Sequence, residues 1–286
     1  MPESTHRDFR PNGLNYDTIA EIFAELAVAA GAVIMGYYGT DSHVRAKADQ
    51  SPVSDADIAA EAVILEGLAV RLPQIPVVSE EAAAGGAEQS EARIFILVDP
   101  LDGTREFLSR NGEFTVNIGL IVDGEPKAGA VYAPAMGRIW IAGTQAVAAT
   151  VPPGELLPPP EQRHTILTRK APSDGLTALA SRSHSDPQTE AFLAQLPIKD
   201  RSPAGSSLKF CRVAEGVADV YPRFGTTMEW DTAAADAVLR AAGGIVLDET
   251  GQPLRYGKFA YRLKNGPFVA WGDKCAASAN AGAKTA

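Results

Sequence analysis

Residues 94–107, I-F-I-L-V-D-P-L-D-G-T-R-E-F, place two aspartates three positions apart directly after a run of apolar residues. The apolar run predicts a buried strand over 93–98. Gly103 and Thr104 can begin a helix, whose free N–H groups and dipole attract a phosphate group. Asp99 and Asp102 would repel that phosphate and each other unless a cation lay between them, and Mg²⁺ binds both carboxylates and phosphate oxygens. A plain Asp-Pro/Asp-Gly turn is the alternative explanation.

Three further acidic segments follow predicted strands or begin predicted helices. Glu80 ends a short apolar strand, where sites of α/β sheets gather. Asp231 stands at the start of a predicted helix over 232–242, and Asp55 and Asp57 stand at the start of another over 55–72. Each segment taken alone has an ordinary explanation. Glu80 fits a solvated turn, Asp231 fits a helix N-cap, and Asp55 and Asp57 fit the acids of a first helical turn. Together with Asp99 and Asp102, they predict a shared cluster of metal-binding oxygens.

The hydrophobic pattern alternates between helix and strand periods. Further helices are expected over 16–38 and 205–215, and further strands over 75–78, 114–122, 127–133, 138–142, 218–224 and 245–248. The segment 143–164 contains five prolines between 152 and 160 and is expected to connect two halves, and 277–286 is expected to be a disordered tail. Interleaved elements predict a layered α/β fold, but the Asp123-Gly124 hairpin argues against a purely parallel sheet.

Composition limits the class of protein. The chain has 286 residues, a net charge of −9 and two cysteines. The sequence has no stretch of about 18 uninterrupted apolar residues, so a membrane-spanning helix is not expected. The polar N-terminus does not resemble a secretory signal. Two cysteines make no disulfide framework, which favours a cytoplasmic location. The acidic balance argues against general nucleic-acid binding but leaves a small anionic substrate open.

Several motifs resemble those of the lithium-sensitive, magnesium-dependent phosphomonoesterases typified by inositol monophosphatase. They are D-P-L-D-G-T-R-E-F (99–107), S-E-E (79–81) and W-D-T-A-A-A-D-A-V-L-R-A-A-G-G (230–244). Further motifs are similar to those of the CysQ-type 3′(2′),5′-bisphosphate nucleotidases within that superfamily. They include R-N-G-E-F-T-V-N-I-G-L-I (110–121), S-R-S-H (181–184), G-S-S-L-K-F-C-R-V-A-E-G (205–216) and Y-P-R-F-G (221–225).

The resemblance implies a fold and a division of labour. The fold is an alternating α-β-α-β-α sandwich, with a metal-binding domain over 14–150 and a substrate-recognition domain over 165–275. One Mg²⁺ would be bound by Glu80, Asp99 and the Leu101 carbonyl, and a second by Asp99, Asp102 and Asp231. Asp57 would help to hold a third and, with Thr104, would position the attacking water, so Asp57, Thr104 and Glu80 are the expected catalytic residues. The expected substrate-binding residues are Asp102, Gly103, Thr104, His184, Ser206, Lys209, Arg223 and Asp231.

The implied activity is the Mg²⁺-dependent hydrolysis of the 3′-phosphate of adenosine 3′,5′-bisphosphate to AMP and phosphate, which removes a by-product of sulfate assimilation. A broader phosphatase of inositol monophosphate or fructose 1,6-bisphosphate is the alternative, and a non-catalytic nucleotide-sensing protein is a further one. The expected partner is a small nucleotide, with neither nucleic acid nor a transmembrane segment. The sequence leaves open a homodimer, peripheral attachment to the inner membrane face and the number of metals bound. It also leaves open the preference among adenosine bisphosphate, its sulfated form and sugar phosphates.

Overall fold

The computed structural model describes residues 15–39, 44–46, 52–85, 91–181 and 186–280. The α-helices are α1 (Tyr16–Tyr37), α2 (Asp55–Arg71), α3 (Glu80–Ala84), α4 (Thr104–Leu108), α5 (Pro187–Leu193), α6 (Leu208–Ala214), α7 (Glu229–Ala241) and α8 (Lys274–Asn280). The strands are β1 (Val44–Ala46), β2 (Pro52–Ser54), β3 (Val77–Ser79), β4 (Ile94–Asp102), β5 (Thr115–Val122), β6 (Glu125–Ala133), β7 (Arg138–Ala142), β8 (Ala146–Thr150), β9 (His164–Thr165), β10 (Leu176–Ser181), β11 (Ile198–Ala204), β12 (Val220–Arg223), β13 (Thr227–Met228), β14 (Ile245–Asp248), β15 (Lys264–Asn265) and β16 (Phe268–Trp271).

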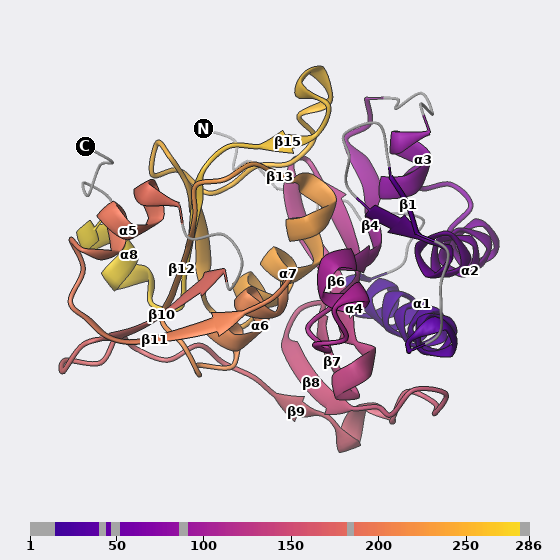
Figure 1. Cartoon of the computed structure of the whole chain (residues 1–286), viewed down its shortest axis with the longest axis horizontal. Coiled ribbons are helices and arrows are strands. Elements are labelled where there is room, and N and C mark those ends of the chain that lie inside the picture. Colours follow the sequence, from indigo (N-terminus) through magenta and orange to yellow (C-terminus); the bar gives the residue numbers. More distant parts are fainter. Residues whose placement is uncertain (1–14, 40–43, 47–51, 86–90, 182–185, 281–286) are drawn as a thin grey trace, which may run out of the picture.

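Helical and sheet layers alternate through the molecule, as predicted. Figure 1 shows α1 and α2 on one side of a sheet, α6 and α7 on its other side, then a second sheet, and α5 with α8 outermost. Three hydrophobic clusters fill the spaces between successive layers. The arrangement is therefore the α-β-α-β-α sandwich that the resemblance implied.

The first sheet has seven strands in the order β3-β4-β5-β6-β7-β8-β9, and only β3 and β4 pair in parallel. Asp123 and Gly124 join β5 to β6 with positive φ angles of 53° and 77°, which the tight hairpin turn requires. The expectation that 143–164 is only a connector is wrong, because β8 and the first residue of β9 belong to this sheet. Strand β8, A-V-A-A-T, pairs with β7 along its whole length, ahead of the proline-rich part.

Helix α1 covers one face of this sheet. The Asn15 side chain caps its first turn by accepting a hydrogen bond of 2.7 Å from the Thr18 N–H. The helix is long and apolar enough to cross a membrane, yet 61% of its most apolar window is buried inside the protein. Its hydropathy is therefore accounted for by packing on α2 and the sheet, as in the core helix of a soluble protein.

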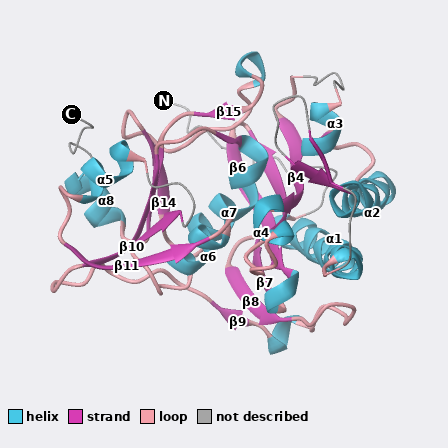
Figure 2. Ribbon diagram, viewed as in Figure 1, coloured by secondary structure: helices cyan, strands magenta, loops and turns pink. Residues whose placement is uncertain are grey.

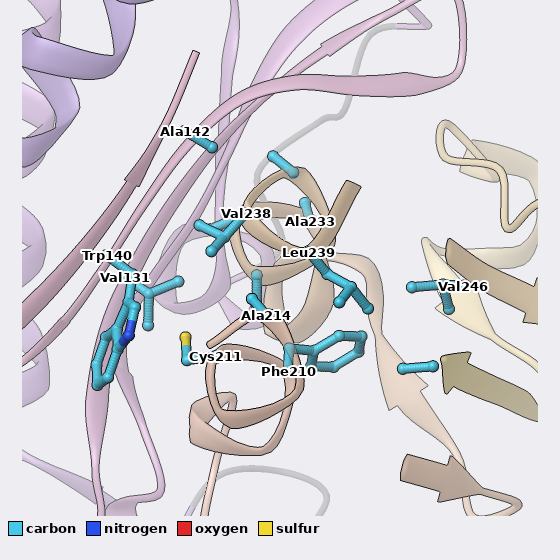
Figure 3. Packing of buried hydrophobic residues seen from close by; sticks show 14 of the residues in the cluster. Val131, Trp140, Ala142, Phe210, Cys211, Ala214, Ala233, Val238, Leu239 and Val246 are labelled. Carbon is cyan, nitrogen blue, oxygen red and sulfur yellow. The ribbon is translucent and has the colours of Figure 1, made fainter. Parts of the chain in front are cut away.

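Helix α7 packs against the opposite face at close range because two sheet residues lack side chains. A Cβ atom added to Gly119 would lie 2.8 Å from the Ala234 nitrogen, and one added to Gly129 would lie 2.6 Å from the Ala234 oxygen. Figure 3 shows Val131 and Trp140 of the sheet facing α6 and α7, with Val246 of the second sheet on the far side of these helices. The two glycines therefore let the backbone of α7 lie directly against the sheet at Ala234.

The second sheet has five strands in the order β11-β10-β12-β16-β14 and mixes parallel with antiparallel pairs. Figure 2 shows its strands beside α5 and α8. Two expectations are corrected here. Residues 277–280 belong to α8, whose Ala277 is buried against this sheet, so the expected tail is helical up to Asn280. Helix α7 begins three residues earlier than predicted, at Glu229.

Candidate active site

Strand β4 carries both aspartates of the D-P-L-D-G-T motif, Asp99 and Asp102. The strand does not end at Val98 as predicted but continues to Asp102, with an irregularity in its pairing to β5 between Asp99 and Asp102. Asp99 is buried and its Oδ1 accepts a hydrogen bond of 3.1 Å from the Leu101 N–H. Gly103 then adopts a φ of 94°, which favours glycine, and begins α4 as predicted. Asp99 pairs with Asn117 and Asp102 with Thr115 on either side of this irregularity, so both carboxylates lie at the edge of the sheet where β4 ends.

Three carboxylates from distant segments converge beside this edge. Oxygens of Glu80, Asp99 and Asp231 all lie within 4.8 Å of one another. Glu80 is the first residue of α3, immediately after β3, and Asp231 lies in the first turn of α7. The parallel pairing of β3 with β4 brings Glu80 to Asp99, and the packing of α7 on the sheet brings Asp231.

The protonation of two of the acids reflects their crowding. Burial, followed by the negative charges of Asp102 and Glu80, raises the pKa of Asp231 well above its ordinary value. Burial raises the pKa of Asp102 to about 6, against the attraction of the Lys209 ammonium. Asp231 is not the N-cap that the sequence suggested, because its Oδ2 accepts a hydrogen bond of 2.8 Å from the Met228 N–H, three residues earlier. These raised pKa values are those of carboxylates that lack enough positive charge around them.

A divalent cation fits this group of donors. Mg²⁺ prefers carboxylate and carbonyl oxygens and is usually bound by a few of them together with water. The cluster consists of carboxylate oxygens alone, is half-buried to buried, and carries pKa shifts that a cation would reverse. The donor set therefore matches a hard cation and not a softer metal that favours sulfur or imidazole.

Asp57 and Thr104 lie together next to the cluster's strand. Asp57 is buried in the first turn of α2, where its Oδ2 accepts hydrogen bonds of 2.8 and 2.6 Å from the Ser54 N–H and hydroxyl. Its Oδ1 lies 3.2 Å from the Thr104 hydroxyl, which is also 3.4 Å from the Leu101 carbonyl oxygen. The fold thus joins three residues that the resemblance assigned to catalysis or metal binding.

A polar cavity of about 150 Å³ adjoins the acids and brings in the second half of the chain. Its lining includes Asp102, Asp231, Ser206, Lys209 and Arg223. Lys209 is buried, and its Nζ donates hydrogen bonds of 2.6 and 3.3 Å to the carbonyl oxygens of Ser206 and Ala204. Burial lowers the pKa of Lys209 to about 8, although Asp102 opposes the change.

Arg223 supplies a second cation to the cavity from the end of β12. Its buried Nε has no hydrogen-bond partner among the residues that the structure describes. Arg223 also lines the cavity, and a guanidinium group in a cavity wall is suited to binding an anion such as a phosphate. His184, which the resemblance also implied, lies outside the described residues.

Three buried polar residues of the site were missed by the sequence analysis. Thr115 and Asn117 of β5 and Ser207, which precedes α6, connect Asp102 to the second half of the chain. The available signal was the pattern T-V-N-I-G-L-I-V, in which two polar side chains two positions apart share one face of an otherwise apolar strand.

A larger cavity, of about 720 Å³, lies elsewhere, between Arg93 and the loop 255–261. Arg93 is paired there with Asp123, and Arg255 is paired with Glu125. Size alone therefore does not identify the site, and the convergent acids and cations favour the smaller cavity.

Comparisons with known proteins agree with this geometry. The sequence model of the inositol monophosphatase family matches residues 15–281. The chain is 47% identical over 234 residues to the 3′(2′),5′-bisphosphate nucleotidase CysQ of Shigella flexneri, which covers 81% of this chain and 91% of that protein. It is 44% identical over 238 residues to CysQ of Salmonella typhimurium, covering 82% and 93% of the two chains.

A solved structure is similar over the same length. The crystal structure of CysQ from Bacteroides thetaiotaomicron, described as a bacterial member of the inositol monophosphatase family, superposes with a TM-score of 0.76 at 36% identity. The match covers 91% of this chain and 98% of that one. With its fold, its acidic cluster and these matches in agreement, the chain belongs to the inositol monophosphatase family.

Proposed function

We propose that the chain is a Mg²⁺-dependent 3′(2′),5′-bisphosphate nucleotidase, which hydrolyses the 3′-phosphate of adenosine 3′,5′-bisphosphate to AMP and phosphate. The observation that carries the proposal is the convergence of Glu80, Asp99 and Asp231 within 4.8 Å of one another, beside a cavity with two cationic side chains. Relatives that are 44% and 47% identical bear the name of this activity. The role would be the removal of a by-product of sulfate assimilation.

The metal ligands in this proposal are those that the motifs suggested. Glu80, Asp99 and the Leu101 carbonyl would hold one Mg²⁺, and Asp99, Asp102 and Asp231 a second, with Asp57 near a third. When bound, such ions activate water and neutralise the charge that develops on a leaving oxygen. The burial of Asp99 and the raised pKa of Asp231 support their place in this set.

Thr104 and Asp57 are proposed to orient the attacking water. The Thr104 hydroxyl has one proton, and the nearest acceptors are Asp57 Oδ1 at 3.2 Å and the Leu101 oxygen at 3.4 Å. Because that proton points to the protein, the lone pairs of Thr104 remain able to accept a hydrogen bond from water. The Ser54 donors keep Asp57 in place for this purpose.

The cavity is proposed to select a substrate with a second phosphate. Two of the three N–H groups of Lys209 are directed to backbone carbonyls, which leaves one for a ligand. Arg223 Nε has no partner among the described residues, and a phosphate is the acceptor that a guanidinium binds well. The Gly103–Thr104 turn would receive the reacting phosphate, and Ser206 and His184 would contact the nucleoside.

Phosphate release from a small panel of esters, measured at a series of Mg²⁺ concentrations, tests the proposal. Adenosine 3′,5′-bisphosphate should be hydrolysed much faster than inositol monophosphate or fructose 1,6-bisphosphate, and EDTA should abolish the activity. Equal rates across the panel would favour the broader sugar phosphatase. Release by Asp99→Asn at the parent's rate would contradict the metal assignment, and no release by the parent would leave a nucleotide-sensing protein.

Substitution of Lys209 tests the second phosphate site separately. Lys209→Ala should raise KM for adenosine 3′,5′-bisphosphate by about 10- to 100-fold, because a buried charge-assisted hydrogen bond contributes about 1.5–3 kcal/mol. Adenosine 3′-monophosphate has no 5′-phosphate, so its KM should change far less. Equal changes for the two substrates would remove Lys209 from the 5′-phosphate site.

The remaining expectations stay part of the proposal. The metal ligands would come mostly from 14–150 and the substrate contacts from 165–275, with Asp231 shared between the two functions. The free thiols of Cys211 and Cys275 favour a reducing, cytoplasmic location.

A further inference from the structure

A chain of hydrogen bonds runs through buried side chains behind Asp102. Asp102 and Asp99 of β4 lie opposite Thr115 and Asn117 of β5. Ser207, immediately before α6, reaches the same place from the second half of the chain. Thr115, Asn117 and Ser207 are at most 2% exposed, so bulk water does not compete for their hydrogen bonds.

One oxygen of Asp102 is used entirely by this group. Asp102 Oδ2 accepts a hydrogen bond of 2.7 Å from the Ser207 N–H and a longer one of 3.4 Å from Asn117 Nδ2. Two donors on one oxygen hold the carboxylate in a single orientation. Oδ1 is then the oxygen of Asp102 that remains for a cation.

The Asp102 carboxylate can only accept, and this sets the donor and the acceptor of every hydrogen bond in the series that starts from it. Because Asn117 turns its amino group to the carboxylate, its Oδ1 must accept, and it does so from the Ser207 hydroxyl at 2.8 Å. The Ser207 proton is thereby used, so Thr115, 2.8 Å away, must donate to Ser207. Thr115 then accepts from the Ser206 hydroxyl at 3.2 Å.

We propose that Asn117 and Ser207 are positioning residues that fix the orientation of Asp102 for metal binding. The inference rests on the proposed function, since it assigns Asp102 to the metal site. Outer partners of metal ligands orient the ligand before the metal arrives, and their loss weakens metal binding by about 10- to 100-fold. The chain also ties Asp102 to the first turn of α6, the helix that carries Lys209.

Calorimetric titration of the full chain with Mn²⁺, without substrate, tests the inference. Asn117→Leu keeps the size of the side chain but removes both its donor and its acceptor, and should raise the Kd for Mn²⁺ by about 10- to 100-fold. Ser207→Ala keeps the backbone N–H that faces Asp102, and should raise the Kd by less than about tenfold. In the double variant the Kd for Mn²⁺ should rise by less than the product of the two single effects, because both substitutions break the same series of hydrogen bonds.

Val116→Ala is the matched control. Val116 lies between Thr115 and Asn117 on β5 but packs into the cluster on the opposite face of the sheet, against α1 and α2. It should lower the melting temperature without changing the Kd for Mn²⁺. The control therefore separates loss of stability from loss of orientation.

Each outcome decides the inference. Parental Mn²⁺ affinity in Asn117→Leu would overturn it, even with phosphate release by the parent intact, and the proposed function would then stand. If Asn117→Leu did not fold, an unchanged Kd in Ser207→Ala would overturn it instead. A parent chain that bound no Mn²⁺ would overturn the proposed function and this inference together.

Discussion

Helix α7 holds two aspartates, a half-buried Asp231 and a buried Asp236, in opposite electrostatic situations. Asp236 is fully buried and accepts hydrogen bonds of 2.7 and 2.9 Å from two nitrogens of Arg240 and one of 2.9 Å from the Tyr256 hydroxyl. Asp231 lies among Asp102, Glu80 and Asp99 instead. Burial raises the pKa of both aspartates. At Asp236 the second largest influence is the Arg240 guanidinium, which lowers the pKa again, whereas at Asp231 it is the negative charge of Asp102, which raises the pKa further.

The comparison separates structure from function within one helix. A buried carboxylate whose countercharge is supplied by the chain is held by its partner, and removing either partner leaves an uncompensated charge. A half-buried carboxylate surrounded by other carboxylates destabilises the fold until a cation arrives from solution. The same residue type on the same helix therefore has two roles, which its neighbours decide.

Breaking the complete pair should have the largest effect on stability. Asp236→Asn leaves the Arg240 guanidinium without its carboxylate in a largely buried position, and should lower the free energy of unfolding by about 3 kcal/mol. Chemical denaturation checks the change. Mg²⁺ should stabilise this variant as much as it stabilises the parent. A variant as stable as the parent would show that Asp236 is not held by its partners as described.

The pH dependence of the metal-free chain should be the next largest effect. Folding raises the pKa of Asp102 to about 6 and that of Asp231 as well, so the folded state keeps protons that the unfolded state releases above about pH 4. The contribution of Asp102 is complete below pH 4 and is lost as the pH rises through 6, and Asp231 adds a loss of the same sign. Between pH 4.5 and 6 the loss from Asp102 should be about 2 kcal/mol, since each pH unit between its unfolded and folded pKa values is worth about 1.4 kcal/mol.

Denaturation between pH 4.5 and 6.5, with EDTA or with saturating Mg²⁺, measures this loss. Bound Mg²⁺ should remove it, because the cation keeps the carboxylates ionised in the folded state. An equal slope with and without Mg²⁺ would contradict the assignment of these acids to the metal.

Neutralising Asp231 should have the smallest effect on the stability of the metal-free chain, and it should raise that stability. Asp231→Asn removes one of the repelling charges, so the metal-free variant should be more stable than the parent by on the order of 1 kcal/mol at neutral pH. The neighbouring carboxylates can accept from the new amide. Stabilisation by Mg²⁺ should be largely lost, and melting curves in EDTA and in Mg²⁺ check both changes. A less stable metal-free variant would place Asp231 with Asp236 as a structural acid.

Much of the fold could be predicted from local pattern. The bounds of α1, α2, β7 and β14 agree with their predicted ranges within one residue, because their periodicity and their stop signals coincide. The pattern did not predict several weakly apolar elements. Strand β11, I-K-D-R-S-P-A, has few apolar residues, and its pairing with β10 is what makes it a strand.

The site was predicted in part for the same reason. Asp99 and Asp102 were recognised because a contiguous motif contains them, and Glu80 and Asp231 because each stands at the end or the beginning of a predicted element. Asn117 and Thr115 looked like ordinary strand residues. Their role depends on the partner strand, and no local pattern contains that information.

The sequence by itself determined the acidic residues, the strand ends that carry them and the family to which the motifs belong. The tertiary structure alone decided that Asp231 lies among other carboxylates while Asp236 is paired with Arg240, and that Ser207 shares a hydrogen bond with Asp102 across 105 positions of the chain. The physical reason is the range of the forces. Helix caps, turns and periodicity act over a few residues, whereas burial and charge repulsion depend on which distant segments the packed sheets and helices bring together.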